Sequence, residues 1–166
     1  REAVVALNDV LDEGLNLHPL QEQRDSVHKY RQIGLGVMGI ADMLIKMGIR
    51  YGSDESLELC DLIGKTMLNE AVKQSALIAK EYGTFSEYKY ENISKSKFFI
   101  ENLNEDTKEM VKKYGLRNSQ LLTIPPTGSI STMIGISGGI EPIFNLSYIR
   151  KTESLHDEDV YYKVYT

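Results

Sequence analysis

The residues best suited to chemistry lie in one stretch, from Leu121 to Phe144, which reads LLTIPPTGSISTMIGISGGIEPIF. Its first four residues are apolar and partly β-branched, as is typical of a buried strand, and Pro125-Pro126 ends that strand because proline has no backbone N–H to donate. Small and hydroxylated residues follow, and then an apolar segment, residues 130–136, with the pattern of a short helix. The stretch therefore predicts a strand, a polar turn and the N-terminus of a helix.

Such a turn is suited to binding phosphate. The first N–H groups of a helix have no intrahelical acceptor, and the helix dipole has its positive end at the same place. Thr127, Ser129 and Ser131 add hydroxyl donors. No Gly-Lys-Ser/Thr sequence follows, so a Walker A loop and a nucleoside triphosphatase are not favoured. From local sequence alone, a helix cap at Thr127 or Ser129 with a relaxed turn at Gly128 explains the residues equally well.

PPTGSIS followed by SGGIEPIF resembles the phosphate loop near the end of the catalytic barrel in the large chain of ribonucleotide reductases. The run GGIEPIFNLSYIRKTESL is most similar to the adenosylcobalamin-dependent class II enzymes, whereas PPTGSIS also occurs in class I chains. The resemblance implies that the diphosphate or triphosphate of a ribonucleotide substrate is held by backbone amides and hydroxyls of Thr127, Gly128, Ser129 and Ile130. It also implies adenosylcobalamin as the cofactor, although no residue here is assigned to it and none is assigned as catalytic.

The composition excludes several classes of protein. A length of 166 residues suffices for one domain with its own core, and we take 1–166 as a single domain or fragment. The net charge of −5, without a clustered Lys/Arg surface, argues against nucleic acid as a partner. No apolar run is long enough to span a bilayer and no signal pattern opens the sequence, so we expect no membrane partner and a cytoplasmic location.

Cysteine and histidine are too few and too scattered to build a redox or metal site. Cys60 is the single cysteine, which excludes an internal disulfide and a CxxC pair. His18, His28 and His156 lack the spacing of metal ligands, so we predict no metal site. Cys60 lies in a helical pattern among apolar neighbours, where a small buried side chain is expected rather than a reactive thiol.

The run GLGVMG, which begins at Gly34, has the glycine spacing of a dinucleotide-binding turn, and Asp54 lies about 20 residues further on. The preceding residues are too charged for a buried first strand and residues 50–53 are a poor second strand, so a nicotinamide-dependent oxidoreductase is the disfavoured alternative. We expect instead one amphipathic helix over about residues 31–47, with glycines that allow close packing. The stretch also resembles the RxxGxGVxGxADxL packing helix of ribonucleotide reductase large chains.

The other segments indicate a chain that is mostly helical with few strands. The helix at residue 53 has Ser53 as its N-cap, and Gly83 and Gly115 are suited to end two of the helices. We expect helices over residues 4–15, 53–82 and 105–114 and from 157 onward, a strand over 144–150, and irregular connections over 16–32 and 84–104.

The resemblance implies an α/β fold, a late segment of the ten-stranded α/β barrel of ribonucleotide reductases. The chemistry of that family uses a cysteine that becomes a thiyl radical in an Asn-x-Cys-x-Glu-like loop, with two further cysteines that reduce the substrate, and none of these motifs is present. Arg1 to Val5 also read as a helix already under way. We therefore expect a fragment or split-gene portion that acts only with the remaining part of the reductase catalytic chain. The alternative is an inactive nucleotide-binding or helical interaction module.

Overall fold

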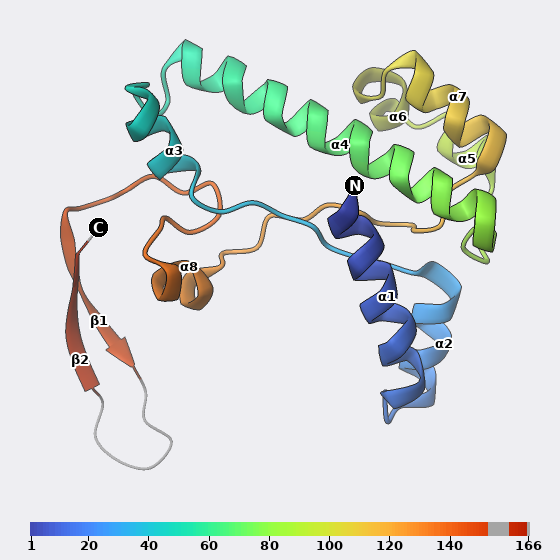
Figure 1. The fold of residues 1–166 in the computed structure, drawn as a ribbon, viewed down its shortest axis with the longest axis horizontal. Coiled ribbons are helices and arrows are strands. Elements are labelled where there is room, and N and C mark those ends of the chain that lie inside the picture. Colours follow the sequence, from blue (N-terminus) through green and yellow to red (C-terminus); the bar gives the residue numbers. More distant parts are fainter. Residues whose placement is uncertain (153–159, 166) are drawn as a thin grey trace. The chain divides into compact units, whose positions relative to one another are not determined.

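The computed structural model describes residues 1–152 and 160–165, and over these residues the chain is mostly helical (Figure 1). The described elements are α1 (Glu2–Leu17), α2 (Gln21–Tyr30), α3 (Ile40–Met47), α4 (Asp54–Tyr82), α5 (Tyr90–Ile93), α6 (Lys97–Asn102), α7 (Glu105–Tyr114), α8 (Gly128–Ile134), β1 (Ser147–Thr152) and β2 (Val160–Tyr165). They divide between two compact units, the first with residues 1–36 and 57–123, the second with residues 37–56 and 124–166. The prediction of many helices and few strands is confirmed.

The long helix α4 lies mainly in the first unit, and it begins and ends as its sequence predicts. The Ser53 hydroxyl accepts the N–H of Ser56 at 3.3 Å, which caps the N-terminus. At the other end Gly83 takes a left-handed conformation with φ of +82° and donates its N–H to Ala79 O at 2.9 Å. Small side chains are buried along this helix, among them Ala71, Ser75, Ala76 and Ala79. They allow neighbouring segments to approach the helix closely.

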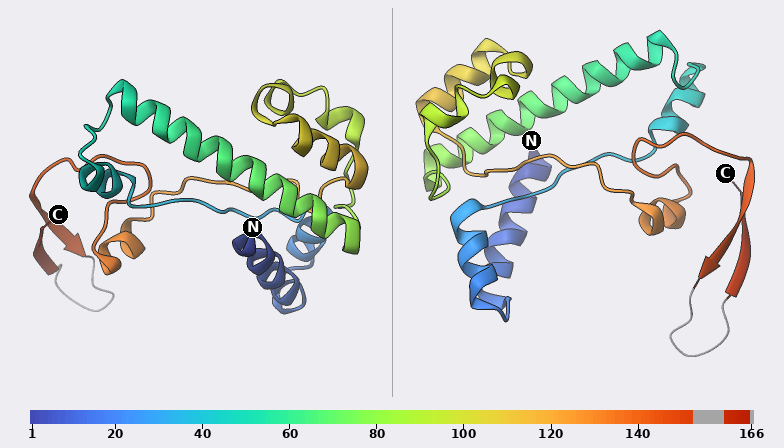
Figure 2. Two further views of the ribbon diagram at one scale, coloured as in Figure 1. Left: turned by 45° about the horizontal axis from the view of Figure 1, so that its top comes forward. Right: turned by 180° about the vertical axis from the view of Figure 1, so that it is seen from behind.

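Helices α5, α6 and α7 lie beside the C-terminal half of α4 (Figures 1 and 2). Helix α7 has the predicted bounds. The Asn104 side chain accepts the N–H of Thr107 and caps its N-terminus, and the helix ends at Gly115, where φ is +77°. Residues 84–104, expected to be irregular, contain the short helices α5 and α6. Phe85 and Phe99 are buried, so the aromatic residues of this region include anchors for packing, as expected.

Helices α1 and α2 lie side by side in both views (Figures 1 and 2). Helix α1 continues through Gly14, and α2 occupies residues that we expected to form an irregular connection. That expectation is wrong because none of the side chains of α2 is buried, so its sequence shows no apolar stripe. Its polar residues support it instead, with Gln21 Nε2 donating to Asp25 Oδ1 at 2.7 Å one turn away.

Two extended segments of the first unit pair in parallel, with Leu35 opposite Leu122. Leu35 N–H donates to Leu121 O at 2.9 Å, and Thr123 N–H donates to Leu35 O at 3.0 Å. The expected helix over residues 31–47 is therefore wrong before Ile40, where α3 begins. Gly34 explains part of the difference, since a Cβ there would lie 2.7 Å from Thr123 Cγ2. A side chain at this position would meet the Thr123 side chain, so the glycine allows the two segments to pair.

The expected strand over residues 121–124 is present only as an extended segment with a single bridge, at Leu122. Leu121 is buried in the core of the first unit, as an apolar run of this kind predicts. The buried core cluster consists of Val4, Ile33, Ala71, Val72, Phe99, Leu103, Val111 and Leu121. Both extended segments thus contribute side chains to the core that holds α4.

The second unit contains α3, α8 and a hairpin of β1 and β2. The two strands are antiparallel, with Ser147 opposite Tyr165 and Thr152 opposite Val160. The expected strand over 144–150 begins later, at Ser147. The helix expected from residue 157 is wrong over residues 160–165, where a segment rich in valine and tyrosine favours a strand. Residues 157–159 lie outside the described part. Among the described residues, no helix is both long enough and apolar enough to cross a membrane.

Candidate functional site

The loop that carries the predicted phosphate-binding residues begins helix α8. Thr127 is the N-cap and has a left-handed backbone with φ of +49°, which is uncommon for a residue other than glycine. The N–H of Ser131 donates to Thr127 O at 2.9 Å and closes the first helical turn. Gly128, Ser129 and Ile130 are exposed. The helix begins earlier than residue 130, so these residues form its first turn.

The three hydroxyl groups of this loop have different roles. Ser131 is buried, and its hydroxyl donates to Gly128 O at 3.4 Å, so it supports the turn from within rather than facing a ligand. The Thr127 hydroxyl accepts the N–H of Gly139 at 2.8 Å. Ser129 is exposed in the first turn. Of the expected hydroxyl donors, Ser131 thus has a structural role, and the Thr127 hydroxyl connects the loop to a second segment through its hydrogen bond with Gly139.

That second segment is the turn Ser137–Gly139, which we call the SGG turn, and it is bound to the start of α3. The N–H of Gly39 donates to Ser137 O at 2.9 Å, and the N–H of Ser137 donates to Asp42 Oδ2 at 2.7 Å. Further along, the Tyr51 hydroxyl donates to Ile140 O at 2.7 Å. The turn is therefore held on one side by α3 and its following loop.

Asp42 is the one acidic residue in the first turn of an otherwise largely apolar helix. Ser137 lies beside the Asp42 carboxyl and donates its backbone N–H to it, and this contact holds the pKa of that carboxyl below its usual range. The carboxylate form is thus favoured near neutral pH, where it accepts hydrogen bonds. A carboxylate near the N-terminus of a helix is also favoured by the helix dipole.

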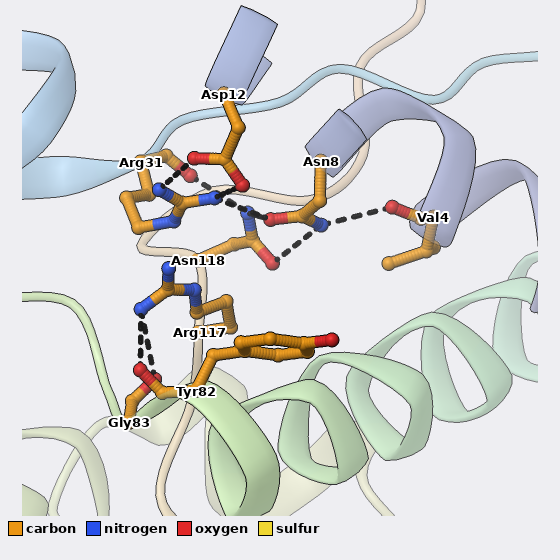
Figure 3. Close-up of polar contacts among 8 residues, drawn as sticks. All are labelled: Val4, Asn8, Asp12, Arg31, Tyr82, Gly83, Arg117 and Asn118. Atoms are coloured by element: carbon orange, nitrogen blue, oxygen red, sulfur yellow. Dashed lines mark hydrogen bonds and ion pairs between the residues drawn. The ribbon is translucent and has the colours of Figure 1, made fainter. Parts of the chain in front are cut away.

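A second polar cluster lies in the first unit, at the start of the two extended segments (Figure 3). Arg31 is 3% exposed, and its guanidinium donates to Asp12 Oδ1 at 2.6 Å and to Asp12 Oδ2 at 2.9 Å. Asn118 is 1% exposed and its Nδ2 donates to Arg31 O and to Asn8 Oδ1, each at 2.9 Å. The cluster connects α1 with both extended segments, so it fixes where these segments start.

The charges in this cluster favour the ionised form of its acid, Asp12. The Arg31 hydrogen bond, followed by its charge, lowers the pKa of the Asp12 carboxyl. Arg117 lies beside this cluster and donates from Nη1 to Tyr82 O at 3.0 Å and Gly83 O at 3.2 Å, where it satisfies carbonyls at the end of α4 (Figure 3). Burial and the charge of Arg31 lower the pKa of Arg117, although it stays protonated near neutral pH. These contacts are those of a structural cluster.

Comparison with known proteins shows the family to which the chain belongs. Residues 1–164 match the ribonucleotide reductase barrel domain. The chain belongs to the ribonucleotide reductase family. The resemblance of the two motifs to reductase large chains is thereby confirmed, as is the expectation of a barrel segment.

Several curated relatives are reductase catalytic chains. The alpha subunit of a ribonucleoside-diphosphate reductase from Chlamydia muridarum is 33% identical over 173 residues, covering 92% of this chain and 16% of the relative. A vitamin B12-dependent ribonucleoside-diphosphate reductase from Thermoplasma acidophilum is 39% identical over 144 residues, covering 87% of this chain and 16% of the relative. A vitamin B12-dependent reductase from Mycobacterium tuberculosis is 31% identical over 154 residues, covering 93% and 20%. The chain spans at most about a fifth of the length of these relatives.

Within this reductase segment, the alternative sites proposed from sequence are not formed. The GLGVMG run passes from an extended segment into α3, but α4 begins where a dinucleotide-binding unit needs a second strand, at Asp54. Cys60 is only half-buried on α4, so it is less enclosed than expected. Among the described residues no group of three or more His, Cys, Asp or Glu side chains is arranged to hold a metal ion. His156 lies outside the described residues.

The sequence interpretation missed Asp42 and Tyr51, whose contacts hold the SGG turn. A signal for Asp42 was available, because a carboxylate in the largely apolar segment IADMLIKM needs a hydrogen-bond partner. The identity of that partner was not available, since Ser137 lies 95 residues away in the sequence. The predicted residues Thr127, Gly128, Ser129 and Ile130 are contiguous and form one turn, as expected.

Proposed function

We propose that this chain supplies the substrate-phosphate loop and part of the barrel wall of a ribonucleotide reductase, which converts ribonucleotides to 2'-deoxyribonucleotides by radical chemistry. The observation that carries the proposal is the first turn of α8, which presents its residues to solvent in a chain that matches the reductase barrel domain over residues 1–164. Membership of the family supports the reaction. The geometry of the turn supports the role of this particular segment.

The phosphate groups of the substrate bind at Thr127, Gly128, Ser129 and Ile130 in this proposal. The N–H groups at Ser129 and Ile130 precede the first residue that donates back within the helix, Ser131, so they have no acceptor inside α8. The sequence carries no charged residue between Leu121 and Ile140. Recognition of the anion would thus rest on backbone dipoles and hydroxyls, which suit a diphosphate or a triphosphate.

The rest of the active site would come from the remaining part of the reductase catalytic chain, including the radical cysteine, and without that part we expect no turnover. Large apolar side chains exposed on α1 and α4 suit such a contact: Val10, Leu17, Leu57 and Leu62. Adenosylcobalamin is proposed because two of the relatives are named vitamin B12-dependent. No described residue here forms a site for it, so no step is assigned to it. We place the protein in the cytoplasm, in keeping with its single cysteine.

Titration calorimetry with cytidine diphosphate and cytidine triphosphate tests the phosphate site on the full-length protein. We expect micromolar binding that is lost in Ser129→Glu, because the new carboxylate repels the phosphate. It should also be lost in Gly128→Pro, which removes an N–H and disfavours the left-handed backbone of Thr127. Ser86→Glu is the matched control, because it adds the same charge at an exposed residue of the first unit. No binding by the unsubstituted protein, even with the remaining part of the catalytic chain present, would instead support an inactive relative of the reductases.

A further inference from the structure

We propose that Asp42 is a positioning residue for the phosphate loop, which it holds through the SGG turn. The inference rests on the proposed phosphate site at Thr127–Ile130 and names a residue outside that site on which its geometry depends. Asp42 touches neither the loop nor a ligand directly. Its effect is transmitted by two hydrogen bonds in series, and all the residues concerned belong to the second unit.

The first link joins α3 to the turn. Ser137 is held through both of its backbone polar groups, since its N–H donates to Asp42 Oδ2 at 2.7 Å and its carbonyl accepts the N–H of Gly39 at 2.9 Å. A short hydrogen bond to a carboxylate is stronger than one between neutral groups. Asp42 and Gly39 together therefore fix both the position and the orientation of the peptide groups at Ser137.

The second link joins the turn to the loop. Gly139 donates its N–H to the Thr127 hydroxyl oxygen at 2.8 Å. Thr127 has an unfavourable backbone conformation, with φ of +49°, and such a conformation persists only where surrounding contacts impose it. The Gly139 hydrogen bond is one of these contacts, so movement of the SGG turn would release the residue that begins α8.

The space between turn and loop shows how closely the two segments fit. A Cβ at Gly138 would lie 2.9 Å from Pro126 O and 3.5 Å from Ser131 Oγ, both of which belong to the loop or the start of α8. A side chain would not fit at Gly138, so the turn lies close to the loop, and a displacement of the turn away from the loop is resisted by the hydrogen bonds. Asp42 accepts one of the hydrogen bonds that hold the turn.

Removal of the Asp42 carboxylate leaves in place the Gly39 hydrogen bond to the turn and the Tyr51 hydrogen bond to Ile140, the residue that follows the turn. The turn would be loosened rather than lost, and we expect the affinity for phosphate-bearing ligands to fall roughly tenfold, the effect of losing one charge-assisted hydrogen bond. A ligand without phosphate should not respond. A residue that served only to stabilise α3 would change the melting temperature and leave both affinities unaltered.

The test is titration calorimetry on the full-length protein, below the melting temperature of every variant, with cytidine diphosphate and with cytidine as the phosphate-free probe. Asp42→Ala should weaken cytidine diphosphate binding about tenfold, with cytidine binding unchanged. Asp42→Asn keeps an oxygen acceptor for Ser137 and should restore affinity to within about threefold of the unsubstituted protein. Glu55→Ala, which removes the same charge from an exposed residue of this unit, should bind normally. Asp42→Ser, too short to reach Ser137, replaces the alanine variant if that variant does not fold.

The outcomes separate this inference from the phosphate site itself. Normal cytidine diphosphate binding by Asp42→Ala overturns the positioning role and leaves the phosphate site standing. Equally weak binding by the asparagine and alanine variants also overturns it, because charge at the start of α3 would then be the cause. Failure of the unsubstituted protein to bind cytidine diphosphate overturns the phosphate site, and the positioning role with it.

Discussion

Replacement of Asn118 by alanine would test whether the buried polar cluster holds the first unit together. The Asn118 side chain makes contacts in two directions: its Oδ1 accepts from Ser75 Oγ at 3.0 Å and from Asn8 Nδ2 at 3.2 Å, and its Nδ2 donates to Asn8 Oδ1 and Arg31 O, each at 2.9 Å. These partners lie on α4, α1 and the extended segment that follows α2. The substitution removes these four hydrogen bonds and leaves the carbonyl of Arg31 without its Asn118 donor.

The expected loss of stability follows from those contacts. A hydrogen bond between neutral groups contributes about 1 kcal/mol net, and a buried group left unpaired costs about 1–3 kcal/mol, so the contacts of Asn118 sum to roughly 4 kcal/mol. A domain of this size is stable by about 5–15 kcal/mol, and the variant should therefore fold but with much reduced stability. With a urea dependence of about 2 kcal/mol per molar, the midpoint of unfolding should fall by roughly 2 M.

Urea unfolding followed by far-ultraviolet circular dichroism measures this change. Asn92→Ala, at an exposed residue of α5, is the control and should leave the midpoint within experimental error. Combining Asn8→Ala with Asn118→Ala should show a coupling energy of about 1–2 kcal/mol, because the two amides bond to each other. A loss below about 1 kcal/mol for Asn118→Ala would refute the assignment of the cluster as a main support of this unit.

Two further predictions concern charge and backbone conformation. Because the pKa of Asp12 is lower in the folded than in the unfolded chain, its ion pair contributes stability above the unfolded pKa of about 4 and loses it as the pH falls through the folded value. In the Asp12→Asn variant, the urea midpoint of unfolding should therefore fall less steeply between about pH 5 and pH 3 than in the unsubstituted protein. The difference should be modest because the Asp12 side chain is 51% exposed. An equally steep fall in both proteins would contradict this prediction. Gly115→Ala should lower the melting temperature, because φ is +77° there and a Cβ would lie 2.3 Å from Thr84 Cγ2. Gly64→Ala, where a Cβ meets no atom within 4 Å, should not lower it.

Elements with local signals could be predicted from the sequence. Helices α4 and α7 have side-chain caps at Ser53 and Asn104 and glycines just beyond their ends, and these signals involve residues no more than a few positions apart. The phosphate-loop candidate was recognised in the same way, from the contiguous run of small and hydroxylated residues before α8. Such signals do not depend on the rest of the fold.

Elements that depend on distant partners could not be predicted from the sequence. The segment with Gly34 reads as a glycine-containing helix by its apolar spacing, and it is extended because Leu122 and Thr123 pair with it from far along the chain. Helix α2 has no buried side chain and therefore no apolar pattern that would predict it, and the strand β2 depends on β1 for its partner. In each case tertiary contact outweighs the local preference of the sequence.

The same distinction explains why the supports of the candidate site were harder to find than the site. A loop that binds phosphate needs its amides in one place, and contiguous residues can supply them. Holding that loop in an uncommon conformation needs partners that the loop itself does not contain, and the chain supplies these from α3, with Asp42 bonded to Ser137 across 95 positions of sequence. In the sequence, a single acidic residue in an otherwise apolar helical segment indicates a contact of this kind. Polar residues at positions of apolar pattern, such as Asn8 in α1 and Asp42 in α3, are thus the places to look for contacts that fix a site at long range.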